Sequence, residues 1–309
     1  MVDIYFILTK SYGALFKRKS IPNIILSSVR IIIRYISNIV LPLYFLYSSK
    51  RNKGQRKNDR KIIVTLTSFP KRINYVWLVV ECMLRQTILP DKIILWLSKE
   101  QFSSYEAIPI KLRNRVSDIF DIKLVDNDLK SHKKYYYAFN EYPDDFVITI
   151  DDDIFYPPYL IEELLSHFDE KNKYIVGRYG FEITYDTKSD INSYNKWIES
   201  DIKNQMHSFF GSGGGTLFIP SLLYKDTLNF KIASRLCPRA DDVWLNAMAR
   251  LSNLSVYISS KELLLPIVIN NNVRLTQANV YENQNDVQIK AVINYYMDKI
   301  QVNPFRQIM

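Results

Sequence analysis

The chain has 309 residues, of which 47% are hydrophobic and 14% aromatic, with eight glycines and twelve prolines. These proportions exclude a disordered or fibrous chain, and the length is enough for one large domain or two small domains with a substantial core. The two cysteines are too few for a disulfide framework or a thiolate metal site, and we expect both to be buried apolar side chains of a reducing compartment.

The net charge of +9 is concentrated near the start of the sequence. Residues 1–61 contain thirteen Lys and Arg against two acidic residues, a net charge of +11, whereas the remainder carries −2. A nucleic-acid-binding domain carries its positive charge on the folded surface that contacts phosphate, so this distribution argues against a nucleic acid as partner. It predicts instead that the N-terminal part approaches an anionic surface.

Residues 21–47 predict a helix that associates with a membrane. Two arginines interrupt its apolar run. Each raises the free energy of membrane insertion by about 2.5–3.5 kcal/mol at the centre of a span, and this roughly offsets the favourable insertion of the apolar side chains. Polar residues recur at every third or fourth position along one side: Asn23, Ser27, Arg30, Arg34, Ser37 and Asn38. We therefore expect an interfacial helix with its arginines toward the head groups, followed by a basic juxtamembrane stretch over 50–61. The alternatives are a true span, or a helix on the protein's own core with a solvated linker.

Beyond residue 61, strands and helices alternate. The predicted strands are 61–67, 92–97, 122–125 and 146–150, and the predicted helices are 75–86, 111–120, 133–141 and 158–168. Farther along, we expect a strand at 174–180, a glycine turn and strand over 211–220, and helices at 241–251 and 286–300. This alternation predicts an α/β fold, with a mostly parallel sheet covered by helices on both faces.

Three aspartates, Asp151, Asp152 and Asp153, directly follow the apolar strand 146–150. Adjacent carboxylates repel one another, and a divalent cation relieves that repulsion, since hard oxygen ligands suit Mg²⁺ or Mn²⁺. The carboxyl end of a strand is also where open α/β sheets bind ligands. Alternation along an extended chain predicts that Asp151 and Asp153 point to one side and Asp152 to the other. The alternative is an acidic turn that caps the following helix.

Six segments, taken together and in order, resemble bacterial glycosyltransferases of GT-A fold, in the broad family-2-like group of capsule, O-antigen and surface-polysaccharide clusters. They are VTLTSFPKRI (64–73), QTILPDKIILWLS (86–98), KYYYAFNEYPDDFVITIDDDIFYP (134–157), GSGGGTLFIP (211–220), RADDVWL (239–245) and NDVQ (285–288). The resemblance implies a Rossmann-like GT-A catalytic domain over 61–309, behind a membrane-associating segment over 1–60. It also implies transfer of a sugar from a nucleotide-sugar donor, most simply a UDP-sugar, to the hydroxyl of a lipid-linked acceptor or a growing surface polysaccharide. Together with the N-terminal charge, it implies a peripheral protein on the cytoplasmic face of the bacterial plasma membrane.

The resemblance also implies roles for individual residues. Asp151 and Asp153 would hold Mg²⁺ or Mn²⁺ against the donor diphosphate, and Asp152 would contact the donor ribose or sugar. Further donor contacts would come from Thr65, Thr67, Ser68, Lys71, Arg72, Asp126, Gly213 and Gly214. Asp242 would be the base of an inverting transfer, supported by Asp241. Some GT-A enzymes use a late histidine as a metal ligand, but none follows His207 here.

Other interpretations of these motifs remain open. Aspartates such as Asp241 and Asp242 are also typical of a helix N-terminus, where they cap the helix. Lys71 and Arg72 are also typical of a surface turn. The glycines of 211–215 are also typical of a flexible hinge. A metal-dependent phosphoryl or nucleotidyl transferase also uses clustered acids, and it would place Asp242 far from Asp153. A non-catalytic membrane scaffold would turn over no sugar nucleotide.

Overall fold

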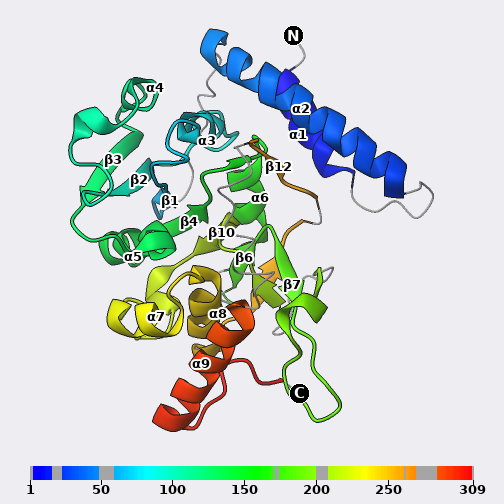
Figure 1. The fold of residues 1–309 in the computed structure, drawn as a ribbon, viewed down its shortest axis with the longest axis vertical. Coiled ribbons are helices and arrows are strands. Elements are labelled where there is room, and N and C mark those ends of the chain that lie inside the picture. Colours follow the sequence, from blue (N-terminus) through cyan, green and yellow to red (C-terminus); the bar gives the residue numbers. More distant parts are fainter. Residues whose placement is uncertain are drawn as a thin grey trace.

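The computed structural model describes residues 3–15, 23–48, 59–169, 171, 174–199, 208–260, 262–268 and 284–307. A seven-stranded sheet lies at the centre, in the order β11-β6-β10-β4-β1-β2-β3 (Figure 1). Its strands are β1 (Ile62–Thr67), β2 (Lys92–Ser98), β3 (Phe120–Val125), β4 (Phe146–Ile150), β6 (Ile175–Gly177), β10 (Gly214–Phe218) and β11 (Val256–Ile258). Two small antiparallel sheets are made by β5 (Ile154–Phe155) with β12 (Leu265–Pro266), and by β7 (Gly180–Glu182), β8 (Ile198–Glu199) and β9 (Ser208–Phe210).

The central sheet is mostly parallel, as expected. β1 pairs in parallel with β2 and β4, and β2 with β3, whereas β10 runs antiparallel to both β4 and β6. The direction of β10 matters for the site, because the start of an antiparallel strand lies beside the end of its neighbour. Gly214 at the start of β10 is accordingly paired with Ile150 at the end of β4.

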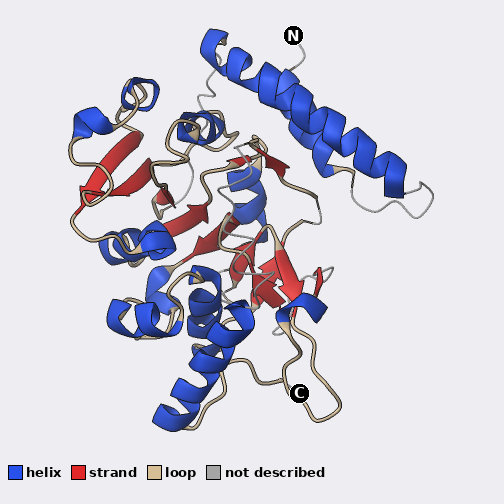
Figure 2. Ribbon diagram, viewed as in Figure 1, coloured by secondary structure: helices blue, strands red, loops and turns tan. Residues whose placement is uncertain are grey.

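Helices cover both faces of the sheet (Figure 2). One face carries α3 (Val76–Met83), α4 (Ile110–Arg113) and α6 (Leu160–His167), and the other carries α5 (Lys133–Glu141), α7 (Phe230–Leu236), α8 (Asp241–Leu251) and α9 (Gln284–Ile300). Successive residues of β1 point to opposite faces, so that Ile62 and Val64 join the first core and Ile63 the second. The α/β fold predicted from the alternation is therefore confirmed.

Most predicted elements are present, with one clear error. The helix predicted over 111–120 is confined to Ile110–Arg113, and residue 120 already begins β3. Phe120 is buried and pairs with Ile93 of β2, so the strand begins two residues earlier than predicted, and residues 114–119 between the two elements form turns and bends. The strand expected at 174–180 is divided between β6 and β7 of different sheets. Both cysteines are free and buried, as predicted.

Two N-terminal helices, α1 (Ile4–Gly13) and α2 (Asn23–Tyr47), lie side by side along one flank of the molecule (Figure 1). α2 is long and apolar enough to cross a membrane, by length and composition alone. The side chains of Tyr5, Leu41 and Phe45 nevertheless belong to the first hydrophobic core. The Tyr5 and Phe45 rings meet edge to face, with centroids 5.2 Å apart.

The C-terminal part of the polar side of α2, at Ser37 and Asn38, faces the protein, which corrects the expected orientation of the whole polar side toward head groups. Ser37 is fully buried, and the Asn38 amide donates to the Pro266 carbonyl at 3.1 Å and accepts from the Val268 amide at 2.7 Å. Arg30 and Arg34 are only partly exposed. The physical reason is that the backbone around β12 needs hydrogen-bond partners, and the polar side of α2 supplies them.

Candidate functional site

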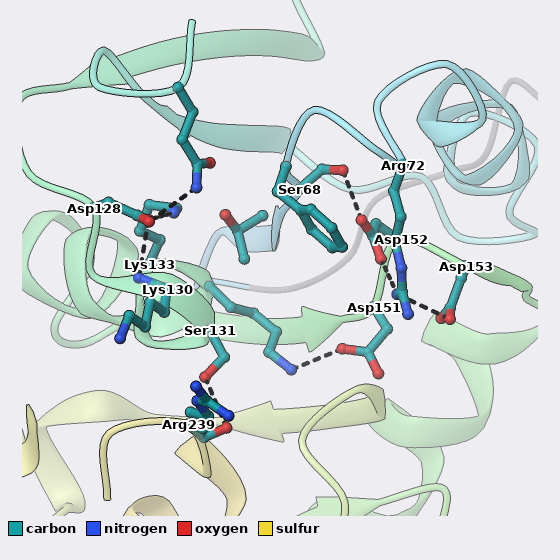
Figure 3. A pocket seen from close by; sticks show the side chains of 14 residues that line it. Ser68, Arg72, Asp128, Lys130, Ser131, Lys133, Asp151, Asp152, Asp153 and Arg239 are labelled. Atoms are coloured by element: carbon teal, nitrogen blue, oxygen red, sulfur yellow. Dashed lines mark hydrogen bonds and ion pairs between the residues drawn. The ribbon is translucent and has the colours of Figure 1, made fainter. Parts of the chain in front are cut away.

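The carboxyl ends of the four parallel strands β1 to β4 surround one cavity of about 320 Å³ (Figure 3). Fourteen residues line it, and most of them are charged: Thr67, Ser68, Phe69, Arg72, Gln101, Asp128, Lys130, Ser131, Lys133, Lys134, Asp151, Asp152, Asp153 and Arg239. Five of these side chains are basic and four are acidic. A cavity at this edge of an α/β sheet, lined by several cations, suits a polyanionic ligand such as a nucleoside diphosphate.

Arg72 neutralises two of the three adjacent aspartates. Its Nη1 lies 2.7 Å from Asp152 Oδ1 and 2.9 Å from Asp153 Oδ2, and Figure 3 shows the guanidinium between them. The other oxygen of Asp152 accepts from the Ser68 hydroxyl at 2.6 Å.

The prediction that Asp152 points away from Asp151 and Asp153 is wrong, since all three side chains line the same cavity. The chain leaves the strand after Ile150 and bends at Asp152.

Lys134 joins the two acidic motifs that lie far apart in the sequence. It lies in the first turn of α5, and its side chain is only 6% exposed. Its Nζ is 2.8 Å from Asp151 Oδ1 and 3.0 Å from Asp241 Oδ2. Although burial works against the ammonium, Asp151 and Asp241 together raise the pKa of Lys134, so it stays charged. One buried cation thus holds the aspartate after β4 beside the aspartate that begins α8.

Ser212 positions both aspartates of the second motif. Its amide donates to Asp242 Oδ1 at 2.8 Å, and its hydroxyl donates to Asp241 Oδ2 at 2.9 Å. Burial acts to raise the pKa of Asp241, but the Lys134 ammonium outweighs it and holds that pKa below its usual range. Burial and the neighbouring Asp241 charge raise the pKa of Asp242 to about 6. One carboxylate is therefore fixed as an anion, while the other has the proton affinity of a general base near neutral pH.

The aspartates after β4 offer oxygen ligands to a divalent cation. Burial and the charge of Asp151 raise the pKa of Asp153 to about 7. Burial is the larger cause, and a hard cation bound at this carboxylate would relieve the repulsion from Asp151. The described residues contain no group of three or more His, Cys, Asp and Glu side chains arranged around one point. In the structure, Asp151 Oδ1 instead pairs with Lys134 Nζ at 2.8 Å and Asp153 Oδ2 pairs with Arg72 Nη1 at 2.9 Å. A metal at these two aspartates would need water and substrate phosphates to complete its shell, as is common for Mg²⁺.

The glycine loop before β10 closes against Asp151. The Asp151 amide donates to the Gly213 carbonyl at 3.1 Å, and the Tyr156 hydroxyl donates to the same carbonyl. A Cβ atom at Gly213 would overlap the Asp151 carboxylate, and one at Gly214 would come within 2.9 Å of Tyr179 Cβ. The loop is therefore glycine-rich because backbone and side chains approach it closely.

Some of the remaining residues predicted to contact the donor line the cavity, and others do not. Thr67, Ser68 and Arg72 line the cavity. Thr65 is fully buried and bonds to the Lys134 carbonyl and to the indole of Trp96, which is a supporting position. Lys71 is exposed and is not among the residues that line the cavity.

Asp126 also lies apart from the cavity lining. Its side chain is 80% exposed and pairs with Lys99 at 2.6 Å. The nearby acidic side chain that does line the cavity is Asp128, which is paired with Lys133. Both residues follow β3, and the chain bends between them. Asp126 therefore points to solvent, whereas Asp128, two residues later, lines the cavity.

Sequence reasoning missed Lys134, Lys133, Ser212 and Arg239. Arg239 directly precedes the Asp241 motif, and Lys133 and Lys134 begin the segment that resembles the glycosyltransferases. The available signal was the pair of adjacent lysines at the start of a predicted helix; the burial that requires them to pair with acids is visible only in the structure.

No family model matches the sequence, and no curated protein matches it. Mannosyltransferase PcManGT from Pyrobaculum calidifontis, solved in complex with GDP-Man and Mn²⁺, is 10% identical over 89% of this chain and 77% of its own, with a TM-score of 0.47. A 4-diphosphocytidyl-2C-methyl-D-erythritol synthase is 12% identical over 75% and 99%, with a TM-score of 0.40. HddC from Yersinia pseudotuberculosis is 16% identical over 52% and 78%, with a TM-score of 0.34. These similarities carry no argument about activity, which has to come from the side chains of this chain.

Proposed function

We propose that this chain is a glycosyltransferase whose catalytic domain spans 61–309 and whose residues 1–60 associate with a membrane. It transfers a sugar from a nucleotide-sugar donor, with UDP-sugars as the first candidates, to a hydroxyl of a lipid-linked or growing surface polysaccharide. It acts as a peripheral protein on the cytoplasmic face of a bacterial plasma membrane. The observation that carries the proposal is Lys134, whose Nζ lies within 3.0 Å of carboxylates from both acidic motifs.

The cavity and the neighbouring second acidic motif then have different tasks. Arg72 and the other cations of the lining hold the donor diphosphate, and Asp151 and Asp153 would hold Mg²⁺ or Mn²⁺ against it. A bound divalent cation stabilises, as a Lewis acid, the charge that develops on the departing diphosphate. The acceptor oxygen attacks the anomeric carbon as the bond from that carbon to the donor phosphate breaks. Asp242 accepts the acceptor's proton, and Asp241 stays ionised beside it, which is an inverting displacement.

The alternative of a metal-dependent nucleotidyl or phosphoryl transferase is less well supported. It requires no base close to the metal-binding aspartates and places Asp242 far from Asp153. Asp151 instead shares Lys134 with Asp241, and Asp242 is the next residue in the chain. This proximity favours a reaction with separate donor and acceptor roles.

The direct test is a screen of UDP-, GDP- and dTDP-sugars for Mn²⁺-dependent hydrolysis and transfer. Asp153→Ala should abolish turnover of the donor that is used, because the metal loses a ligand. Asp242→Asn should keep donor binding, measured calorimetrically, but lose transfer. Asp298→Asn removes an exposed carboxylate of α9 and is the charge-matched control. Equal turnover by all of these proteins would refute the site assignment.

The pH dependence of transfer tests the base directly. Because the pKa of Asp242 is raised to about 6, Asp242 is protonated below that pH and cannot accept a proton. We expect kcat/KM to rise with pH through about 6 and to level off above it. Saturating Mn²⁺ should be present throughout, since a bound cation keeps Asp153 ionised and removes its contribution. A flat profile across this range would exclude Asp242 as the base.

A further inference from the structure

α2 presents an exposed apolar face that the transfer chemistry does not use. We call this the isoleucine face, and its side chains are 46% to 86% exposed: Ile24, Ile25, Ile31, Ile32, Tyr35, Ile36, Ile39, Leu43, Leu46 and Tyr47. α1 adds three less exposed apolar side chains, Ile4, Phe6 and Ile7. Both helices run along the flank of the molecule (Figure 1). A continuous apolar surface of this extent is rare on a soluble monomer and marks a contact with a membrane or another molecule.

The C-terminal half of α2 is attached to the body on its opposite side. Leu41 and Phe45 belong to the first hydrophobic core, and Asn38 bonds to the backbone around β12. At the end of the helix, Arg85 Nη2 donates to the Ser48 carbonyl at 2.7 Å. A helix held in this way cannot cross a bilayer without leaving the protein. It can only present its outer face to a surface.

The charge of this part of the chain favours lipid over a second copy as the occupant. Residues 1–61 carry a net +11, and basic clusters flank α2 in the sequence, at 17–19 and 50–57. Two copies meeting through the isoleucine face would bring these like charges together, whereas an anionic bilayer attracts them.

We propose that α1 and α2 form a foot that lies flat on an anionic bilayer, with the isoleucine face immersed in the interface and without a membrane span. This extends the membrane association proposed above by assigning its face and its orientation. It differs from the orientation expected from the sequence, because the polar side of α2 binds the protein and the apolar side binds lipid.

The foot is connected to the transfer site by short paths. The Tyr5 hydroxyl donates to the Tyr156 carbonyl, and the Tyr156 hydroxyl accepts from the Asp151 amide at 2.7 Å. On the other path, Asn38 holds β12, and the Ile267 amide next to β12 donates to the Asp153 carbonyl at 2.8 Å. A docked foot therefore sets the position of both metal-binding aspartates relative to the lipid surface. For the proposed glycosyltransferase, this is where a lipid-linked acceptor is presented.

Flotation with phosphatidylcholine vesicles, with and without phosphatidylglycerol, tests the docking face. The double variant Ile32→Asp with Ile39→Asp should lower partitioning onto the anionic vesicles about ten-fold or more, because two apolar side chains leave the interface and two negative charges are added. Ile110→Asp with Val287→Asp is the matched control, since these side chains are 57% and 60% exposed on the body. Thermal unfolding confirms that both proteins are folded. Equal partitioning of both double variants would overturn the proposal.

A second measurement distinguishes a flat foot from a span. Single cysteines at Ile25, Ile36 and Leu46 carry an environment-sensitive fluorophore, and lipid-attached quenchers report its depth; both native cysteines are buried. A flat foot predicts the same shallow depth at all three positions, whereas a deep Ile36 between two shallow ends would overturn it. Self-association in sedimentation without vesicle binding would also overturn it and identify a second copy as the occupant. None of these measurements uses donor turnover, so failure of the foot and failure of the glycosyltransferase activity are separable.

Discussion

Replacement of Lys134 by methionine is expected to lower transfer about a hundred-fold or more. The Lys134 ammonium is the shared partner of Asp151 and Asp241, and its removal leaves the buried Asp241 carboxylate and the half-exposed Asp151 carboxylate without their common cation. A displacement of reacting groups of about 1 Å can cost about a hundred-fold in rate. Removing one partner of a buried ion pair also costs about 3 kcal/mol in the free energy of unfolding.

A purely structural role would not move the pH profile, and this separates the two interpretations. Without the ammonium, Asp241 and Asp242 lose their main compensating charge, so the pKa of Asp242 should rise further. We expect the acid limb of kcat/KM in Lys134→Met to shift to higher pH, and Lys134→Arg to restore part of the shift.

Lys123→Met is the matched control for Lys134→Met. It breaks a surface pair with Glu141 in which both side chains are about one-third exposed, and such pairs are worth about 0–1 kcal/mol. Full activity of Lys134→Met with an unchanged acid limb would show that Lys134 does not connect the two motifs.

Alanine at Gly213 is expected to abolish metal-dependent turnover while leaving the fold nearly as stable. The added Cβ would overlap the Asp151 carboxylate, which is the far end of a side chain that is 43% exposed and can turn toward solvent, while Lys134 keeps Asp241 as its partner. The backbone at Gly213 is not left-handed, so alanine adds no conformational strain there. The carboxylate would lose its place beside Lys134 and at the proposed metal site.

Gly211→Ala is the comparison for this substitution. Its Cβ would come 3.1 Å from Tyr179 Cδ1, a contact that a small shift of the ring relieves. We expect turnover to fall only a few-fold in Gly211→Ala, and the apparent affinity for Mn²⁺ to weaken only in Gly213→Ala. Similar losses in both variants, or loss of the folded state in Gly213→Ala, would show that the loop has a general packing role.

Local pattern was enough to predict the central architecture. The short strands are nearly continuous runs of β-branched and aliphatic residues. The helix α8 was predicted from its sequence, and its predicted and observed bounds agree at Asp241 and Leu251. The position of Asp151 to Asp153 at the end of a buried strand follows from the same pattern, because a strand's end in a parallel sheet is determined by its own apolar run. The early start of β3 is an exception, since Phe120 pairs with Ile93 of β2, 27 positions away, and no local pattern records that contact.

The sequence by itself determined the fold class, the location of two acidic motifs and the concentration of positive charge at one end. Only the tertiary structure decided which of 41 Lys and Arg side chains joins those motifs, that Asp126 points to solvent, and which side of α2 faces the protein. The physical reason is distance along the chain. Lys134 meets Asp241 across 107 positions and Asn38 meets Pro266 across 228, and no local periodicity records such a pairing.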